Sequence, residues 1–320
     1  MSGGPHACDG TDPVRSVLVL AHTGRPEALN ALTKVVHRFH EAGIRTVMTS
    51  EEAAALEDQD RALVVQCDLE GALDGAEMVI VLGGDGTILR AAELVRGTDT
   101  PLLGVNLGHV GFLAEAEREE IVGTVARVAA GDYRVEERMT LDVQVVADGE
   151  VIASSWAVNE VSVEKANRER MLELVVDVDG RPLSSFGADG VIAATPTGST
   201  AYAFSAGGPV VWPEVEALLV VPISAHALFA RPLVIAPTSV VGVEVLPGMS
   251  DGGVLWCDGR RTFAAPAGAR VEVRRSAQTV KLARLSTGIF TDRLVAKFGL
   301  PVAGWRGPRP GPGSSDGGRA

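Results

Sequence analysis

The sequence predicts an α/β domain with a parallel sheet, followed by an all-β domain of two packed sheets. Before Tyr133, apolar strand-like runs alternate with helical patterns, which is typical of a parallel sheet covered by helices on both faces. After Tyr133, short alternating runs are joined by Asp-Gly pairs, which is the sequence pattern of β-hairpins. The length of 320 residues is sufficient for two domains with buried cores.

In the first domain, the expected strands and helices alternate along the chain. They are a strand over 16–20, a helix over 27–42 closed by Gly43, strands over 46–48, 61–66 and 78–82, a helix that begins at Ile88, a strand over 101–105, and a charged helix over 115–130 that ends at Gly131. His22 and Arg25 follow the first strand, where α/β sheets bind ligands, although an ordinary loop is the simpler interpretation. The segment 106–113, which includes His109, follows the last of these strands.

In the second domain, hairpin patterns dominate. The expected strands cover 141–146, 151–163, 172–177, 181–186, 239–246, 254–257, 270–274 and 280–285, with turns at Asp148-Gly149, Asp179-Gly180 and Asp258-Gly259. A helix over 290–298 is expected to return to the first domain. The expected boundaries are a disordered lead over 1–15, the α/β domain over 16–135, the β-sandwich domain over 136–286, the returning helix over 287–305, and a disordered Gly- and Pro-rich tail over 306–320.

The composition is that of an ordinary globular protein, with 46% hydrophobic and 22% charged residues. The net charge of −12 argues against a nucleic-acid or anionic-membrane partner, because both attract a basic surface. No apolar run approaches the roughly 18 residues of a membrane span, and no signal peptide is evident. Cys8, Cys67 and Cys257 are far apart and in no metal-ligand spacing. We therefore expect a cytoplasmic protein without a metal site of its own.

The stretch 78–91 joins a strand-like run to a helical pattern through Gly83-Gly84-Asp85-Gly86-Thr87. Glycine permits positive φ and the close approach of a ligand, and the N-terminus of the following helix attracts phosphate. Asp85 is the one ionisable group placed where a phosphorylated ligand would lie, and a carboxylate suits a proton acceptor or a magnesium-side ligand rather than a phosphate clamp. We interpret the stretch as a phosphoryl-transfer loop; the alternative is a tight turn without chemistry.

Two better-known glycine-rich loops do not match this stretch. A Walker loop needs Lys followed by Ser or Thr after its last glycine, and no such pair is present. The dinucleotide-binding fingerprint needs a third glycine, and the chain has Leu89 at that position. The loop therefore belongs to neither class.

Two stretches of the second domain supply further candidate residues. Asn159-Glu160 follows a β-run, and a carboxamide beside a carboxylate can hold the vicinal hydroxyls of a ribose, although a satisfied pair at a strand edge is the alternative. Asp189-Gly190 leads into an apolar strand, then a hydroxyl- and glycine-rich turn over 195–200 and a short helix. This arrangement suits phosphate binding with Tyr202 beside a base, whereas the alternative is a helix capped by Thr and Ser.

Together these stretches resemble the motifs of the NAD kinase family, in the same order along the chain. The resemblance rests on the segments 83–87, 159–160, 189–190, 197–202 and 222–232, and covers roughly residues 16–305. The first motif is shared with lipid kinases and phosphofructokinases. The combination is therefore what indicates the family.

The resemblance implies a phosphotransferase that acts on an alcohol group. Its members transfer a phosphoryl group from ATP, or in some cases from inorganic polyphosphate, to the adenosine 2′-hydroxyl of NAD, giving NADP. The implied structure is an α/β domain plus a β-sandwich domain with the site between them, in homodimers or homotetramers. By this resemblance Asp85 is the catalytic proton acceptor, and the phosphate loop comprises Gly83, Gly84, Gly86 and Thr87. The implied NAD-binding residues are Asp85, Gly86, Arg90, Asn159, Glu160, Arg170, Asp189, Thr200, Ala201, Tyr202, Ala203, Phe204 and Ser205.

Magnesium is expected to enter with the nucleotide, because the sequence shows no carboxylate cage for it. Two other functions are open on the sequence alone: a lipid or sugar kinase that shares only the first motif, and a catalytically silent sensor that binds NAD. The acidic composition counts against a lipid kinase at a membrane surface. The intact Asp85 counts against a silent sensor.

Overall fold

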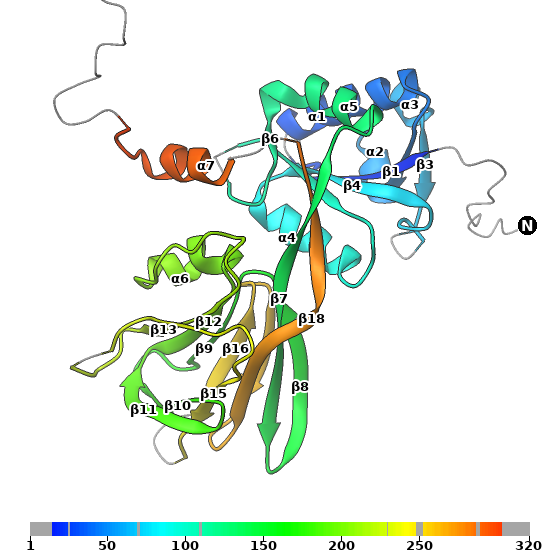
Figure 1. Ribbon diagram of the computed structural model, residues 1–320. Coiled ribbons are helices and arrows are strands. Elements are labelled where there is room, and N and C mark those ends of the chain that lie inside the picture. Colours follow the sequence, from blue (N-terminus) through cyan, green and yellow to red (C-terminus); the bar gives the residue numbers. More distant parts are fainter. Residues whose placement is uncertain are drawn as a thin grey trace, which may run out of the picture.

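A computed structural model describes residues 15–24, 26–68, 71–108, 111–228, 230–247, 252–285 and 289–302. Figure 1 shows two domains that are joined by long strands. The predicted disordered lead and tail lie almost entirely outside the described residues, and so do Cys8, Arg25 and His109.

The first domain is built on the parallel strands β5, β4, β1, β2 and β3, in that spatial order. Helices α1 and α5 pack on one face of this sheet, and α4 packs on the other. The elements are β1 (Ser16–Ala21), α1 (Pro26–Glu41), β2 (Arg45–Thr49), α2 (Ser50–Ala54), α3 (Asp58–Arg61), β3 (Val64–Cys67), β4 (Ala76–Gly83), α4 (Asp85–Val95), β5 (Leu102–Asn106), β6 (Ala116–Glu117), η1 (Arg118–Glu120) and α5 (Ile121–Ala129). The predicted α/β class is confirmed.

The second domain is a sandwich. A six-stranded antiparallel sheet in the order β14-β13-β12-β9-β16-β17 faces β10, β15, β18 and β7 across one apolar core. The elements are β7 (Arg134–Ala147), β8 (Glu150–Ala157), β9 (Glu160–Lys165), β10 (Leu172–Val178), β11 (Arg181–Ala188), β12 (Gly190–Ala194), η2 (Thr197–Thr200), α6 (Tyr202–Ser205), β13 (Leu218–Ile223), β14 (Leu233–Ile235), β15 (Val241–Val245), β16 (Gly253–Cys257), β17 (Arg261–Ala265), β18 (Arg270–Arg284) and α7 (Ile289–Phe298). The predicted all-β second domain is confirmed.

The long strands β7 and β18 run through both domains, as Figure 1 shows. One end of β18 pairs with β15 inside the sandwich, and the other end pairs in parallel with β5, where Leu282 lies opposite Leu102. The strands of the first domain and one wall of the sandwich therefore form a single twelve-stranded sheet. The prediction of separate strands over 270–274 and 280–285 was wrong, because a register shift between Arg275 and Thr279 lets one strand continue.

Other differences from the predicted elements also have local causes. The strand expected over 61–66 begins only at Val64, because Arg61 ends a short helix and donates to the carbonyls of Ala53 and Leu56. The helix expected over 115–130 is α5 and starts at Ile121. The three Asp-Gly pairs are hairpin turns as predicted, since both residues of each pair have positive φ. Within the described parts of the chain, no helix is long and apolar enough to cross a membrane.

Candidate functional site

The glycine loop joins the last residue of β4, Gly83, to the first residue of α4, Asp85. None of the three glycines in the loop has a positive φ, so the expectation that they supply this conformation was wrong. Gly83 is required for packing, because a Cβ there would overlap with the Thr87 side chain. Gly84 and Gly86 have open space where a Cβ would be, and both are exposed. Their role is to leave the backbone accessible at the helix N-terminus.

The half-buried Asp85 is held by the loop that follows β5. Its two carboxylate oxygens accept hydrogen bonds from the backbone amides of Phe112 (3.0 Å) and Leu113 (3.1 Å). Gly111 lies against the carboxylate so closely that a Cβ at this position would overlap with it. An ionised carboxylate offers about four lone-pair sites, so two amide contacts leave it able to accept a further hydrogen bond.

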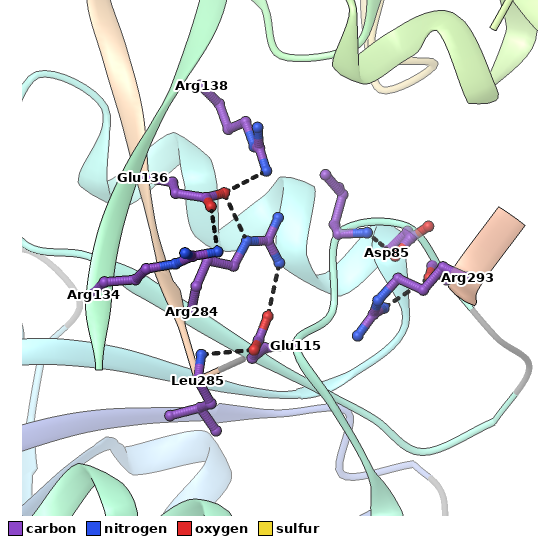
Figure 2. A network of polar contacts seen from close by, with 10 residues as sticks. Asp85, Glu115, Arg134, Glu136, Arg138, Arg284, Leu285 and Arg293 are labelled. Atoms are coloured by element: carbon purple, nitrogen blue, oxygen red, sulfur yellow. Dashed lines mark hydrogen bonds and ion pairs between the residues drawn. The ribbon is translucent and has the colours of Figure 1, made fainter. Parts of the chain in front are cut away.

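A network of arginines and glutamates fixes this loop, and Figure 2 shows it beside Asp85. Arg293 of α7 donates to the carbonyl of Gly111 (2.8 Å). Glu115 accepts from Arg284 (3.1 Å) and from the amide of Leu285 (2.6 Å). The loop that holds Asp85 is therefore attached to β18 and to α7. The predicted helix does not begin at residue 115, because the Glu115 amide donates to the carbonyl of Gly104 and the next two residues form β6 beside β5.

The same network continues onto β7 through Glu136. This carboxylate accepts hydrogen bonds from Arg134 (3.0 Å), Arg138 (2.8 Å) and Arg284 (3.2 Å). Burial lowers the pKa of Arg138 to about 10, and the nearby charge of Arg284 acts in the same direction. Burial also lowers the pKa of Arg293, whose Nε has no hydrogen-bond partner among the described residues. Sequence reasoning missed these residues, although charged side chains within strands that are otherwise apolar were a usable signal.

Asn159 and Glu160 lie where the predicted strand 151–163 breaks into β8 and β9. Both are buried, with 8% and 7% of their surface exposed. Burial raises the pKa of Glu160 to about 8, and the neighbouring Asp258 carboxylate adds to the rise. The Oε2 of Glu160 has no hydrogen-bond partner within the described structure. A buried polar atom without a protein partner is a position that a ligand or an ordered water can satisfy. The strand-edge alternative, in which the pair is already satisfied, does not fit Glu160.

The turn after β12 is attached directly to this pair. The Thr195 hydroxyl donates to the carbonyl of Val158 (2.6 Å), and the Thr195 amide donates to the carbonyl of Asn159 (2.9 Å). Gly198 packs against the backbone of Asn159, where a Cβ would overlap with the carbonyl. Two stretches that are far apart in the sequence therefore form one rigid unit.

Several hydroxyls of this turn bond within the protein. Thr200 donates to the carbonyl of Thr197, and Ser199 exchanges hydrogen bonds with the backbone of Val211. In the part of the chain that the structure describes, neither η2 nor α6 has a side-chain cap. The Thr195 hydroxyl does accept a hydrogen bond from the amide of Gly198 (3.0 Å) at the start of η2, so the alternative of a capped turn holds in part for this Thr. The other hydroxyls shape the turn, and α6 is only one helical turn long.

The short helix α6 presents an exposed aromatic pair beside Glu160. Tyr202 is 37% and Phe204 is 38% exposed, whereas Ala203 between them is buried. Burial raises the pKa of Tyr202, and the charges of Glu164, Asp189 and Glu160 add to this effect. Asp189 is half-buried and forms an ion pair with Lys165 (2.5 Å). Tyr202, Glu160 and Asp189 thus lie near enough for their charges to interact.

A cleft lies beside the loop that holds Asp85 and beside the η2 turn, but Asp85, Glu160 and Tyr202 are not part of its lining. Its lining comes from the loop that holds Asp85, from the η2 turn, from the arginine network and from α7, and includes Phe112, Leu113, Thr197, Thr200 and Arg293. Aromatic contacts continue along α7, where the Phe298 ring lies 4.5 Å from Phe204 and 6.1 Å from Phe112. The cleft therefore lies between the two domains.

Three predicted residues lie at the edge of this arrangement. Arg90 is exposed on α4, and its charge acts on Glu52 of α2. Arg170 is exposed in the loop before β10. His22 is exposed after β1. Among the described residues, no group of three or more His, Cys, Asp or Glu side chains is arranged to hold a metal ion.

Chemically, the candidate site, which extends beyond the lining of the cleft, combines three features. An accessible helix N-terminus suits phosphate, and Asp85 beside it is a carboxylate that can accept a proton. A buried carboxyl group with an unpartnered oxygen suits a ligand hydroxyl. Exposed aromatic rings suit a flat base. The arrangement fits the transfer of a phosphoryl group to a hydroxyl of a nucleotide.

Comparisons with known proteins identify the relatives of this chain. Residues 17–133 match the family model of the ATP-NAD kinase N-terminal domain, and residues 158–285 match that of the ATP-NAD kinase C-terminal domain. The NAD kinase of Leifsonia xyli subsp. xyli is 61% identical over 296 residues, which cover 92% of this chain and 97% of the relative. NAD kinase 2 of Streptomyces avermitilis is 59% identical over 293 residues, with the same coverage of each chain.

Solved structures share the fold at lower identity. A yeast NADH kinase complexed with NADH has a TM-score of 0.82 and 23% identity, and the match covers 91% of this chain and 89% of that one. An NAD kinase from Archaeoglobus fulgidus in complex with ATP has a TM-score of 0.68 and 24% identity, and the match covers 88% and 98%.

Proposed function

This chain belongs to the NAD kinase family, and we propose that Asp85 is the base of the reaction that this membership assigns to it. The protein is a kinase that phosphorylates NAD to NADP. The lipid- or sugar-kinase and silent-sensor alternatives are therefore set aside. The proposal concerns how the described residues perform this reaction.

The observation that carries the proposal is the placement of Asp85 at the open N-terminus of α4. The backbone is accessible at Gly84 and Gly86, and the amides of Phe112 and Leu113 hold the carboxylate. In our proposal Asp85 accepts the proton of the adenosine 2′-hydroxyl as this oxygen attacks the terminal phosphoryl group of the donor. Phosphoryl transfer depends mainly on position and charge balance, so a base that receives the proton late needs no unusual pKa.

The NAD side of the proposal uses the buried pair and the turn attached to it. Glu160 offers the unpartnered oxygen to a ribose hydroxyl, and Asn159 lies beside it. We assign the residues from Thr200 to Ser205, with Asp189, to the walls around the rest of NAD. Arg90 and Arg170 are retained as NAD contacts on the family resemblance alone, since both are exposed.

We propose ATP as the donor and Mg²⁺ as the divalent cation. The name of the matching family, ATP-NAD kinase, supports ATP. Mg²⁺ is usually held by one or two carboxylates together with the phosphates of a nucleotide, and Asp85 is the carboxylate available at the loop. When bound, the cation would neutralise charge on the phosphates. We further propose that the protein forms a homodimer or homotetramer and that it is cytoplasmic. We place the domain boundary near residue 135.

The test is a coupled assay on purified protein. NAD is supplied with Mg-ATP, and NADP is detected with an NADP-specific dehydrogenase, for the wild type and for Asp85→Asn. We expect kcat to fall about 10²-fold or more in the variant, because the proton acceptor is lost, while NAD binding stays measurable by calorimetry. Near-wild-type kcat in the variant contradicts the assignment of the base. Polyphosphate in place of ATP, in the same assay, tests the alternative donor.

A further inference from the structure

Asp258 is a turn residue with a buried side chain. It lies with Gly259 between β16 and β17, and both residues have positive φ, as a tight hairpin turn requires. Side chains at such turns normally point to solvent, but only 2% of the Asp258 side chain is exposed. Hairpin geometry accounts for the backbone of this turn but not for the buried carboxylate.

The carboxylate of Asp258 is enclosed by the turn that contains Asn159 and Glu160. It accepts hydrogen bonds from the amides of Val158 (2.9 and 3.0 Å), Asn159 (2.7 Å) and Glu160 (3.4 Å). The Asp258 amide donates to the carbonyl of Glu160 (2.9 Å) in return. The bonds from Val158 and Asn159 oppose the rise in the pKa of Asp258 that burial causes. Three consecutive amides are thus oriented by one side chain.

Arg261 connects this carboxylate to the other domain. Its Nη2 lies 3.1 Å from Oδ2 of Asp258, and its Nε lies 3.5 Å from Oε1 of Glu93. The guanidinium also lies over the Trp156 ring, 4.4 Å from its centroid. Glu93 belongs to α4, the helix whose first residue is Asp85. A continuous chain of contacts therefore runs from the Asn159–Glu160 turn to the helix that carries the proposed base.

We propose that Asp258 and Arg261 are positioning residues for phosphoryl transfer. They hold the Asn159–Glu160 turn in register with α4, and so set the distance between the ribose of NAD and Asp85. This inference rests on the roles proposed above for Asp85 and Glu160. Val158 belongs to the same apolar cluster as the α4 residues Ile88 and Leu89, and such packing brings the two elements together but leaves their relative position less strictly defined. The hydrogen bonds of Asp258 and the ion pair between Arg261 and Glu93 add further constraints on this position. The contact between Arg261 and Glu93 is an ion pair and not a hydrogen bond, since the Nε of Arg261 has no hydrogen-bond partner among the described residues.

The neighbouring Arg260 provides a matched control. Its Nε also lies near Oε1 of Glu93 (3.2 Å), and no contact with Asp258 is recorded among the described residues. Replacing either arginine by glutamine removes one cation beside Glu93. Only Arg261→Gln breaks the connection to Asp258. The two variants therefore separate the connection from the local charge.

The experiment compares Arg260→Gln and Arg261→Gln in kcat, in NAD affinity without donor, and in melting temperature. We expect Arg261→Gln to lower kcat about tenfold or more while NAD affinity changes less, because a small misplacement of reacting groups is costly. Arg260→Gln should keep kcat and NAD affinity within about twofold of the wild-type values, because an exposed ion pair contributes little. Equal kcat values in the two variants overturn the inference. A loss in Arg261→Gln that affects affinity alone also overturns it.

Further variants test the chain of contacts itself. Arg261→Lys retains the charge and should recover part of kcat. Glu93→Gln should lower kcat in the wild-type background and have little additional effect in Arg261→Gln, because both act through one connection. Additive effects overturn the inference. If Asp85→Asn keeps wild-type turnover while Arg261→Gln does not, the base assignment fails and the positioning of Asn159 and Glu160 stands.

Discussion

The two carboxyl groups of the candidate site, Asp85 and Glu160, are held in opposite ways. Asp85 is half-buried, and both of its oxygens accept hydrogen bonds from backbone amides. Glu160 is buried, and one of its oxygens has no partner among the described residues. The Asp85 side is accessible and its geometry is set by the loop 111–113. The Glu160 side is enclosed, and its geometry is set by the turn 195–200 and by Asp258.

This difference suggests a division of labour. A group that takes part in chemistry needs access to both substrates and a fixed direction, which backbone amides provide at little conformational cost. A group that selects a ligand works better when it is buried, because an unpartnered polar atom penalises every ligand that fails to satisfy it. Changes near Asp85 should therefore alter kcat, and changes near Glu160 should alter NAD binding and stability.

The largest effect is expected from Gly198→Ala. The added Cβ would overlap with the backbone of Asn159, which cannot move without displacing the buried pair. We expect KM for NAD to rise about tenfold or more and the protein to lose about 1–3 kcal/mol of stability, as for an overpacked core. Kinetics and denaturant unfolding measure both effects. Gly123→Ala on α5, where a Cβ meets open space, is the control and should be neutral or stabilising. If KM for NAD is unchanged in Gly198→Ala, the turn 195–200 and the Asn159–Glu160 pair do not form a rigid NAD-binding unit.

A smaller effect of another kind is expected from Gly111→Ala. Here the Cβ would overlap with the end of the Asp85 side chain, which can rotate away from the amides of Phe112 and Leu113. We expect kcat to fall about tenfold, with KM for NAD changed less, because the base loses its direction. Steady-state kinetics with the same Gly123→Ala control measure the split. If KM for NAD rises while kcat stays at the wild-type value, it is wrong that changes near Asp85 act on kcat and changes near Glu160 act on NAD binding.

The same comparison shows what the sequence can reveal. The loop 83–87 was recognisable because strand, glycines, acid and helix are consecutive, so local physics defines the motif. The alternation of strands and helices, and later the Asp-Gly turns, predicted the two fold classes for the same reason. The buried Glu160 was named from the sequence only as one member of an Asn-Glu pair, since burial depends on the residues that pack around it.

The residues that support the site were not predictable in this way. Asp258 contacts an amide 100 positions earlier in the chain, and its Asp-Gly pair looks like any hairpin turn. Arg284 and Glu115 meet across 169 positions, and residues 116–117 pair with β5 where periodicity alone would extend a helix. Such connections arise from tertiary packing, which has no fixed spacing in the sequence.

The smallest predicted effect concerns stability and tests the Glu160 side directly. Burial raises the pKa of Glu160 to about 8 from a reference value of 4.5. Between these pH values the unfolded chain releases the proton and the folded protein retains it, so this residue makes folding less favourable as pH rises through that window. Glutamine has nearly the same shape and no charge. Glu160→Gln should therefore match the wild-type melting temperature near pH 5 and exceed it above pH 8, by about 2 °C or more.

Thermal unfolding of the ligand-free protein at several pH values measures this difference. Titrating groups that do not interact with Glu160 cancel, because the variant and the wild type are compared at each pH, whereas Asp258, Glu164 and Tyr202 contribute through their interaction with it. Glu150→Gln, which changes an exposed glutamate on β8, is the matched control and should show no gain that grows with pH. A constant difference for Glu160→Gln would mean that the carboxyl group is ionised in the free protein throughout. The Glu160 side would then resemble the Asp85 side, and ligand selection would have to come from Asn159 and the turn 195–200 instead.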